Sequence, residues 1–484
     1  MTEEYEYDNQ YIDDNTQLIN QGGYGCVYYP GLRCNPCTKD KPCKTKFEKN
    51  KYVSKIQVLD NNTNEYTVSK IITSILSFEN YFAPIVNLCK VELNRFDENQ
   101  VDSYGDKCGV MMKKKHKQFV MLHIPYIPNG NFAKAITKKK ATSSFTFLFD
   151  SYNHLLQSMY LLYKNNIIHY DLKAENVLYN WNKDSPIVID FGLSVNFIDI
   201  IKKLNLIDGS KIVNTESIKR IKKGKYKKGL ITTSIRSRLK KIFYVFAADY
   251  YLWCLEIIFI SFLLHGDMDS TDYSINYVDF KDGTYILTIE DVTNICTKYI
   301  KSNKGLKGFS SYFNHQFIEL CINYYKKYIG MKSDEIIYDL LQYWYTWDTY
   351  SINIMYLKLL YYTYENKINN SLHYLYSLML YGIHPDPTRR KLPNEIKFSL
   401  FNIHYQNDTE QELTILMDKY LKTNTNSIVE KIEEDDKTIR SIDKDIDKDI
   451  DKDINKDNYG INLLNNNDQE LNSEEITNFN IDLK

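Results

Sequence analysis

The chain has 484 residues, and its 62 acidic and 61 basic side chains leave a formal net charge of −1. This length allows two or more units with their own cores, and so balanced a charge indicates no polyanionic partner. The acidic N-terminal residues lack the apolar stretch of a secretory signal, and the longest apolar run, residues 250–264, is too short and too broken to span a membrane. Nine scattered cysteines are typical of a reducing compartment rather than of a disulfide scaffold. We therefore expect an intracellular protein that is not secreted.

The first quarter of the chain predicts a strand-rich unit. Residues 1–15 are acidic and polar, and in residues 16–127 the apolar runs are short and punctuated by Gly, Pro and Asn. One helix is predicted within this unit, over residues 64–78, because its apolar side chains recur at spacings of three and four.

The rest of the chain predicts helices followed by a tail. The apolar spacing becomes helical from residue 145, and helices are also predicted within residues 333–392. Residues 246–264 are apolar nearly all round, which predicts a buried helix. Residues 403–484 are polar, and the Ile-Asp-Lys-Asp repeat over 442–457 is too highly charged to bury a core. We expect this tail to be largely disordered.

A glycine cluster opens the strand-rich unit. Gly22, Gly23 and Gly25 precede a predicted strand, where the absence of a Cβ lets backbone amides approach phosphate oxygens. Lys55 follows in a second apolar-edged strand, and a charge at such a position needs a partner, for which Glu65 at the start of the predicted helix is suited. The alternative is that Lys55 is an ordinary surface lysine on an edge strand.

Two further motifs carry the groups that phosphoryl transfer from ATP requires. In the first, Asp171 is followed two residues later by Lys173 and five residues later by Asn176; in the second, Asp190 precedes Phe191-Gly192 and follows an apolar run. One Asp can accept a hydroxyl proton, the Lys can neutralise the γ-phosphate, and Asn and the second Asp can hold Mg²⁺. His169 is expected to pack and to hold the loop rather than to act as a base.

Together these residues resemble the motifs of the eukaryotic-type protein kinase superfamily, over about residues 19–390. The chain looks most similar to the divergent Ser/Thr kinases of giant DNA viruses (Mimivirus-like kinases). The resemblance implies a two-lobed α+β fold, with a small β-rich N-terminal lobe (16–127) and a larger helical C-terminal lobe (128–402). It also implies a long activation segment (190–249), a helical insert, and ATP and Mg²⁺ held between the lobes. The expected partner is a protein substrate with a Ser or Thr hydroxyl, in the host cytoplasm or the virion.

The resemblance also assigns roles to individual residues. Asp171 and Lys173 are the expected catalytic groups, and Asn176 and Asp190 the expected Mg²⁺ ligands. The residues expected to bind the nucleotide lie in the glycine loop, the second strand, the helix and the hinge: Ile19, Asn20, Gly22, Gly23, Gly25, Val27, Lys55, Glu65, Tyr126 and Ile127. Two further positions are structural, since Asp249 resembles the buried Asp that anchors the catalytic loop, and Arg390 the late Arg of the family.

The sequence departs from the family pattern in three places. Asn20 stands at the first glycine of the loop, where its tolerance of positive φ preserves the turn. Tyr170 replaces the Arg that pairs with an activation-segment phosphate, so activation by that phosphate is not expected. No Ala-Pro-Glu is found between Asp190 and Asp249, so Arg390 is expected to have another partner or to be solvated.

Two other features have competing interpretations. Cys34, Cys37 and Cys43 suggest a metal knuckle, but no fourth ligand is evident, and a loop insert with free thiols is favoured.

Residues 202–241 contain fourteen Lys or Arg against two acidic residues. This basic segment suits acidic substrates, a polyanion or an anionic membrane, but its few aromatics give no specific nucleic-acid signal, and a mobile solvated loop is the favoured interpretation.

Three functions remain open from the sequence. A Ser/Thr protein kinase is favoured because Lys173 is typical of that class, and Lys173 with Phe191-Gly192 argues against a small-molecule kinase of related fold. A catalytically silent kinase-like scaffold is the main alternative. It has no physical need for a pair of Mg²⁺ ligands.

Overall fold

A computed structural model describes 16–21, 25–34, 48–59, 63–91, 108–113, 118–128, 130–132, 134–135, 144–221, 225–266, 283–364 and 370–406. The predictions for the acidic N-terminal segment, Gly22, Gly23 and the tail beyond 406 lie outside these residues. The described chain forms two units. One comprises the residues up to Pro128 together with Ile189–Gly192, and the other comprises Asn129–Val188 and the residues from Leu193 on.

The first unit is built on a five-stranded antiparallel sheet. Its strands are β1 (Gln17–Gln21), β2 (Gly25–Tyr29), β3 (Tyr52–Val58), β4 (Asn87–Val91) and β5 (Phe119–Pro125). They are ordered β1-β2-β3-β5-β4, which places β3 and its Lys55 in the middle of the sheet. The possibility that Lys55 lies on an edge strand is therefore excluded. Lys55 pairs with Val27 on one side and Leu122 on the other.

Four short helices accompany the sheet in the described part of this unit. They are α1 (Thr63–Thr73), α3 (Gly109–Lys113) and the 3₁₀ helices η1 (Lys49–Lys51) and η3 (Phe78–Asn80). Val68 and Ile72, two of the apolar residues that predicted α1, are fully buried. The predicted helix is therefore present, although it ends at Thr73, before the predicted limit at 78.

Two disulfides cross-link this unit. Cys26 on β2 is bonded to Cys108, just before α3, and Cys34 is bonded to Cys89 on β4. The prediction of free thiols is wrong for Cys34, which is also lost as a candidate metal ligand. Cys37 and Cys43 lie outside the described residues. The pattern of residues along the sequence could not reveal these pairs, because the two cysteines of each pair are 82 and 55 residues apart. The cysteine argument for a reducing compartment no longer holds.

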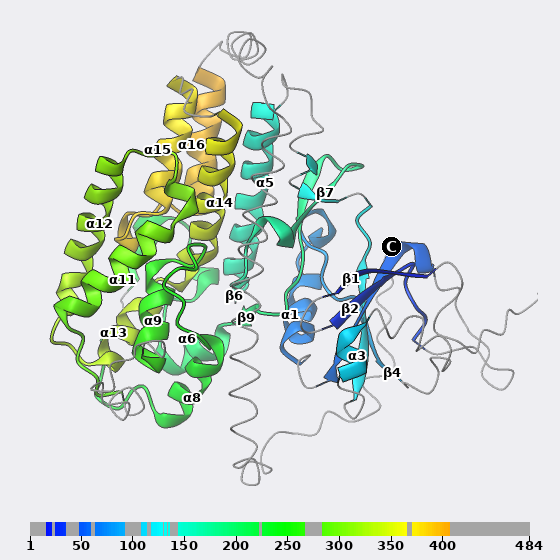
Figure 1. Ribbon diagram of the computed structural model, residues 1–484, viewed down its shortest axis with the longest axis horizontal. Helices are drawn as coiled ribbons and strands as arrows, with labels where there is room; N and C mark the ends of the chain where they lie inside the picture. Colours follow the sequence, from blue (N-terminus) through cyan, green and yellow to red (C-terminus); the bar gives the residue numbers. More distant parts are fainter. Residues whose placement is uncertain are drawn as a thin grey trace, which may run out of the picture. The chain divides into compact units, whose positions relative to one another are not determined.

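The second unit is helical. Its long helices α5 (Ser144–Lys164), α14 (Trp347–Tyr364), α15 (Asn370–Gly382) and α16 (Pro393–Gln406) run side by side in Figure 1. Two small sheets pair β6 (Ile167–Ile168) with β9 (Val195–Asn196), and β7 (Val177–Asn180) with β8 (Ser185–Val188). The segment that contains Asp171 and Asn176 lies between β6 and β7.

A second group of helices lies between residues 255 and 341. It consists of α9 (Leu255–His265), α11 (Ile289–Ser302), α12 (Ser311–Tyr325) and α13 (Ser333–Leu341). Every residue of α9 from Leu255 to Leu264 is buried, as its uniformly apolar sequence predicted. However, the helix begins nine residues later than expected. Residues 246–254 are not helical, and they bring Tyr250 into contact with Asp171 and Trp253 into contact with Tyr170.

The basic segment 202–241 contains helices rather than a solvated loop. It includes the end of α6 (Ile198–Leu204), α7 (Thr215–Arg220) and most of α8 (Thr233–Ile242). Ile235, Arg236 and Leu239 of α8 are buried. Among the described residues of this segment, Lys and Arg other than Arg236 are exposed or partly exposed.

The described chain thus has a β-sheet N-terminal region and a helical C-terminal region, as the sequence predicted. Among the helices that the structure describes, none is long and apolar enough to cross a membrane.

Candidate active site

Lys55 lies between two carboxylates in the first unit. Its Nζ is 3.3 Å from Oε1 of Glu65, on α1, and 3.2 Å from Oδ1 of Asp190. Burial opposes the charge, but Asp190 and Glu65 more than offset this and raise the pKa of Lys55 above its usual value. Gln57 donates to Glu65 as well, over 3.2 Å, so the carboxylate of Glu65 is fixed from two directions. Lys55 is thus a permanently charged group of fixed position.

The glycine loop is described only at its two ends. Ile19 and Asn20 lie on β1, where Ile19 is half exposed and the Asn20 side chain accepts from the amide of Gln21. Gly25 and Val27 lie on β2. A Cβ at Gly25 would lie 2.4 Å from the carbonyl oxygen of Ile56, so the close approach of β2 to β3 requires glycine there.

The hinge residues follow β5. The amide of Tyr126 donates to the carbonyl of Lys51 over 2.9 Å, and its ring stacks on Tyr29 with 3.8 Å between centroids. The Tyr126 N–H is therefore engaged within the protein. The N–H of Ile127 makes no backbone hydrogen bond to another described residue.

The catalytic segment lies in the second unit, between β6 and β7. Nδ2 of Asn176 donates to both the carbonyl oxygen and Oδ2 of Asp171, at 2.8 Å each, and Nζ of Lys173 lies 3.2 Å from Oδ2. The hydroxyl of Tyr250 donates to Oδ1 over 3.0 Å. The side chain of Asp171 remains 15% exposed, so it is fixed in orientation and still accessible.

The donor set suits Mg²⁺. Both hydrogens of the Asn176 amide face Asp171, and its oxygen Oδ1 accepts no hydrogen bond from another described residue. Mg²⁺ prefers oxygen ligands, and the amide oxygen of Asn176 and the carboxylate of Asp190, taken one by one, are ligands of that kind. The side chain of Asp190 is about half exposed (48%), which leaves room for a ligand. No cluster of three His, Cys, Asp or Glu occurs among the described residues, so the remaining ligands would be water and phosphate oxygens.

The anchor of the catalytic segment is Asp348 and not Asp249. The carboxylate of Asp348 accepts from the amides of His169 and Tyr170, at 2.7 and 3.0 Å. Burial raises the pKa of Asp348, and His169 with the two amides opposes the shift. Tyr170 has a φ of 71°, in a region that costs a bulky residue about 1–2 kcal/mol, and these two hydrogen bonds stabilise that turn. Asp249 is only half buried and cannot serve this purpose.

Tyr170 is part of an aromatic cluster. Its ring lies 4.9 Å from that of Trp253 and 6.0 Å from that of Phe243, and burial raises its pKa well above the usual value. Its hydroxyl has no hydrogen-bond partner among the described residues. A neutral, buried phenol cannot pair with a phosphate, and Tyr170 therefore contributes packing where the resembling family has a cation.

The late Arg has a buried partner that the sequence did not reveal. Nη2 of Arg390 lies 2.9 Å from Oε1 of Glu256, at the start of α9, and neither side chain is more than 2% exposed. Arg390 also donates to the carbonyl of His384 and to the hydroxyl of Thr346. Arg390 therefore has another partner, which is one of the two outcomes expected, and it is not solvated. Glu256 lies beyond Asp249, outside the stretch in which Ala-Pro-Glu was sought.

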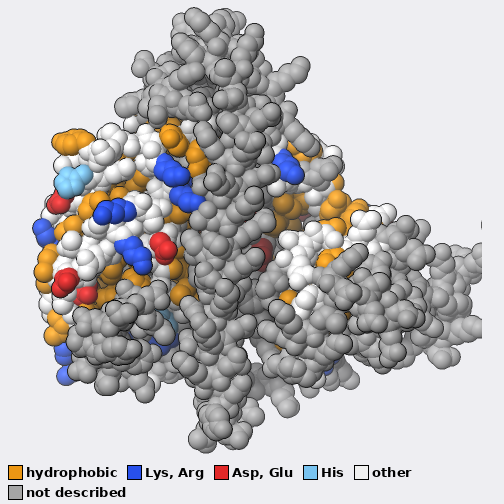
Figure 2. Space-filling view, in the orientation of Figure 1, with side chains coloured by type: hydrophobic (Ala, Val, Ile, Leu, Met, Phe, Trp, Pro, Cys, Tyr) orange, Lys and Arg blue, Asp and Glu red, His pale blue; other side chains and the backbone are white. Residues whose placement is uncertain are grey.

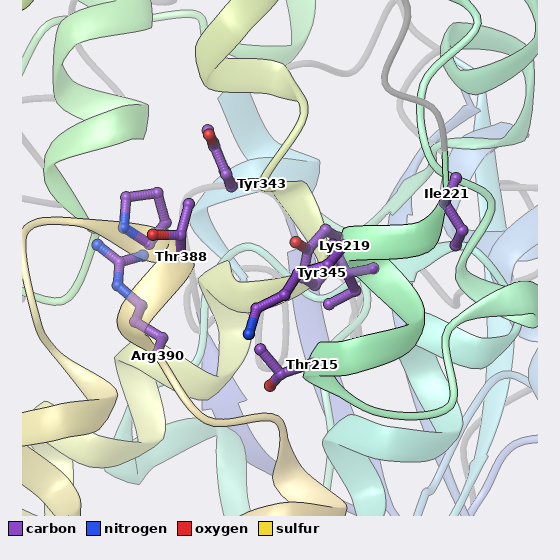
Figure 3. Close-up of a pocket in the computed structure, with 9 residues that line it drawn as sticks. Thr215, Lys219, Ile221, Tyr343, Tyr345, Thr388 and Arg390 are labelled. Atoms are coloured by element: carbon purple, nitrogen blue, oxygen red, sulfur yellow. The ribbon is translucent and has the colours of Figure 1, made fainter.

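A pocket of about 360 Å³ lies in the second unit near this ion pair (Figure 3). Its polar groups are already engaged. The hydroxyl of Thr215 donates to Glu395, the amine of Lys219 pairs with Glu216, and the Arg390 guanidinium binds Glu256. The pocket therefore offers no convergent set of free donors for a phosphate, and we assign it no catalytic role.

On the face that Figure 2 shows, the described Lys and Arg side chains of the second unit lie in small groups separated by other side chains, many of them apolar. Within the basic segment, Lys219 pairs with Glu216, Arg236 with Asp334 and Arg238 with Asp199. This arrangement gives no specific support to a polyanion site.

Sequence reasoning missed Asp348, Glu256 and Tyr250. For the first two a signal exists: each is a single carboxylate in the first turn of an otherwise apolar, buried helix, where only a structural partner can offset its burial. Tyr250 carries no such signal, because it is one of 42 tyrosines.

Comparison with known proteins agrees with this geometry. Residues 22–211, which is less than half of the chain, match the family model of the protein kinase domain. A stretch of 194 residues is 25% identical to mitogen-activated protein kinase kinase kinase A of Dictyostelium discoideum, covering 40% of this chain and 17% of that protein. A stretch of 148 residues is 34% identical to dual specificity tyrosine-phosphorylation-regulated kinase 2 of Drosophila melanogaster, covering 29% of this chain and 19% of that protein.

The chain thus matches less than a fifth of the length of either relative. These matches support the eukaryotic-type protein kinase superfamily and, with it, a phosphotransferase.

Proposed function

We propose that this protein is a Mg²⁺-ATP-dependent serine/threonine protein kinase, which transfers the γ-phosphoryl group of ATP to Ser or Thr hydroxyls of proteins. The observation that carries the proposal is the arrangement around Asp171, whose carboxylate is fixed by Asn176 and Lys173 and yet remains accessible. A purely structural carboxylate has no need of a lysine amine at 3.2 Å on a partly exposed surface. In phosphoryl transfer, positioning and charge neutralisation carry most of the catalysis.

Each residue has a defined task in this proposal. Asp171 orients the acceptor hydroxyl and takes its proton, and Lys173 neutralises charge on the transferred group. Lys55 binds the α- and β-phosphates, and Glu65 keeps its amine in place. Asn176 and Asp190 would hold Mg²⁺, which supplies further neutralisation of phosphate charge when bound.

The choice of Ser or Thr rests on Lys173, because a Lys two residues after the base is typical of Ser/Thr kinases. The Gly-Gly-Tyr-Gly-Cys-Val loop and the Asn-, Ile- and Lys-rich composition lead us to propose in addition a kinship with the kinases of giant DNA viruses. A location in the host cytoplasm or the virion rests on that kinship alone, because the cysteine argument does not support it.

The test is phosphotransfer from γ-labelled Mg²⁺-ATP to an acidic protein, to a basic protein and to the chain itself. Asp171→Asn and Asp190→Ala are the inactive variants, and we expect each to lower the rate about 100-fold or more. Asp171→Asn should leave nucleotide affinity within about twofold, since Asp171 acts on the acceptor hydroxyl. Asp199→Asn, in an exposed surface pair with Arg238, serves as the matched carboxylate control and should retain the wild-type rate.

The outcomes separate the competing functions. Phosphoserine or phosphothreonine in a protein lane, lost in both inactive variants, supports the proposal. Nucleotide binding without label in any lane would favour a silent scaffold. Label confined to tyrosine would contradict the Ser/Thr assignment while leaving a protein kinase.

A further inference from the structure

The carboxylate of Asp171 is held from two sides by different parts of the chain. Local residues occupy Oδ2, which accepts from Asn176 at 2.8 Å and lies 3.2 Å from the amine of Lys173. The other oxygen, Oδ1, accepts from the hydroxyl of Tyr250 at 3.0 Å, from a position 79 residues further along the chain. Tyr250 belongs to none of the motifs on which the proposed function rests.

Tyr250 is itself rigidly placed. It is 3% exposed, and its amide donates to the carbonyl of Ala247. Its ring lies 4.8 Å from that of Trp253, whose indole N–H donates to the carbonyl of Tyr170 over 2.9 Å. Tyr250 and Asp171 are therefore tied together twice, through the hydroxyl and through Trp253 to the residue that precedes Asp171.

We propose that Tyr250 is a positioning residue for phosphoryl transfer, whose hydroxyl fixes the rotation of the Asp171 carboxylate so that its accessible lone pair faces the acceptor hydroxyl. A carboxylate oxygen accepts two hydrogen bonds, so Tyr250 leaves one direction on Oδ1 open. This inference rests on the proposed function. Preorganisation of this kind acts on the rate of the chemical step, because it removes orientations from which transfer cannot occur.

Tyr250 takes no chemical part in phosphoryl transfer. The acceptor oxygen forms a bond to the γ-phosphorus while the bond from that phosphorus to the bridging oxygen breaks, and ADP leaves. The acceptor proton passes to Asp171. Tyr250 keeps its own proton throughout and contacts neither phosphate nor acceptor.

A competing interpretation is that Tyr250 mimics the acceptor hydroxyl and blocks the base until a substrate displaces it. The ring is buried, and its backbone and aromatic contacts are fixed, which favours a permanent positioning contact over a displaceable inhibitory one. The two roles predict opposite effects on the rate of transfer. Removing the hydroxyl lowers the rate if Tyr250 positions Asp171, and raises the rate if Tyr250 inhibits it.

The experiment compares Tyr250→Phe with Tyr251→Phe in the full chain. Both variants keep a buried ring and lose one hydroxyl, but the hydroxyl of Tyr251 accepts from Lys358 on α14. We expect Tyr250→Phe to lower kcat about tenfold, the usual effect of losing a hydrogen bond to a charged group. KM for ATP and for the protein substrate should stay within about twofold, and Tyr251→Phe should retain the wild-type kcat.

A second pair of variants excludes a merely structural effect. In an Asp171→Asn background, measured by single turnover, adding Tyr250→Phe should lower the rate little further, because both substitutions disrupt the same pair of side chains. The inference is overturned by an unchanged or increased kcat in Tyr250→Phe, or by the same tenfold loss in the Asp171→Asn background. A wild-type chain that transfers no phosphate overturns the proposed function and this inference with it, whereas an active wild type with an unaffected Tyr250→Phe overturns the inference alone.

Discussion

The two units fix their reactive side chains in different ways. In the strand-rich unit, Lys55 meets Glu65 only ten residues further along the chain, on the helix that follows its strand. In the helical unit, the segment around Asp171 is held by Tyr250 and Asp348, 79 residues beyond Asp171 and 179 residues beyond His169. Spacing in the sequence therefore reveals the first arrangement and conceals most of the second.

The units also differ in what stabilises them. The described part of the strand-rich unit contains two disulfides, whereas Cys254, Cys296 and Cys321 of the helical unit are buried and not cross-linked. The helical unit has instead the buried pair of Glu256 and Arg390. All four tryptophans, at 181, 253, 344 and 347, lie in the helical unit, so tryptophan fluorescence reports on that unit alone.

The largest effect is expected from breaking the buried ion pair. Arg390→Met leaves the Glu256 carboxylate, which is fully buried, without its cation, and this should cost about 3–5 kcal/mol of unfolding free energy. Denaturant unfolding followed by tryptophan fluorescence measures the loss. Arg389→Met, at an exposed arginine next to it in sequence, should change the stability by less than about 0.5 kcal/mol.

A double variant sharpens this test. Glu256→Leu combined with Arg390→Met removes both charges, and it should recover much of the stability because no unpaired buried charge remains. A double variant no more stable than Arg390→Met would show that the hydrogen bonds of Arg390 to His384 and Thr346, and not the ion pair, carry the effect.

The next effect is expected in the strand-rich unit. Removing the disulfide with Cys26→Ala and Cys108→Ala frees a loop of 82 residues, which should cost about 3 kcal/mol. The loss should appear in limited proteolysis and far-UV circular dichroism while the tryptophan transition stays in place. If alkylation and mass spectrometry find both thiols free in the wild-type chain, the cross-link is absent and this prediction fails.

The smallest effect concerns the two candidate anchors. Asp348→Asn weakens the hydrogen bonds to the amides of His169 and Tyr170, which should cost about 2 kcal/mol of stability and lower kcat. Asp249→Asn, in a half-buried residue, should leave both quantities nearly unchanged. Equal effects of the two changes would contradict the assignment of the anchor to Asp348.

The misassigned anchor shows where sequence reasoning stops. Asp249 was assigned by its resemblance to the buried Asp of the family, yet the structure uses Asp348, which stands at the start of an apolar helix. The same limit applies to the late Arg. Glu256 was visible only as an interruption of an apolar run, and nothing local indicated that its partner lies 134 residues away.

The sequence by itself determined a strand-rich first unit followed by a helical one, and the local sets Lys55 with Glu65 and Asp171 with Lys173 and Asn176. These follow from periodicity and short spacings, which act within one or two neighbouring elements. Only the tertiary structure decided which carboxylate anchors the catalytic segment, which partner Arg390 has, how the cysteines pair and which tyrosine reaches Asp171. Each of these choices selects one partner among many chemically equal candidates, and only the packing of distant segments makes that selection.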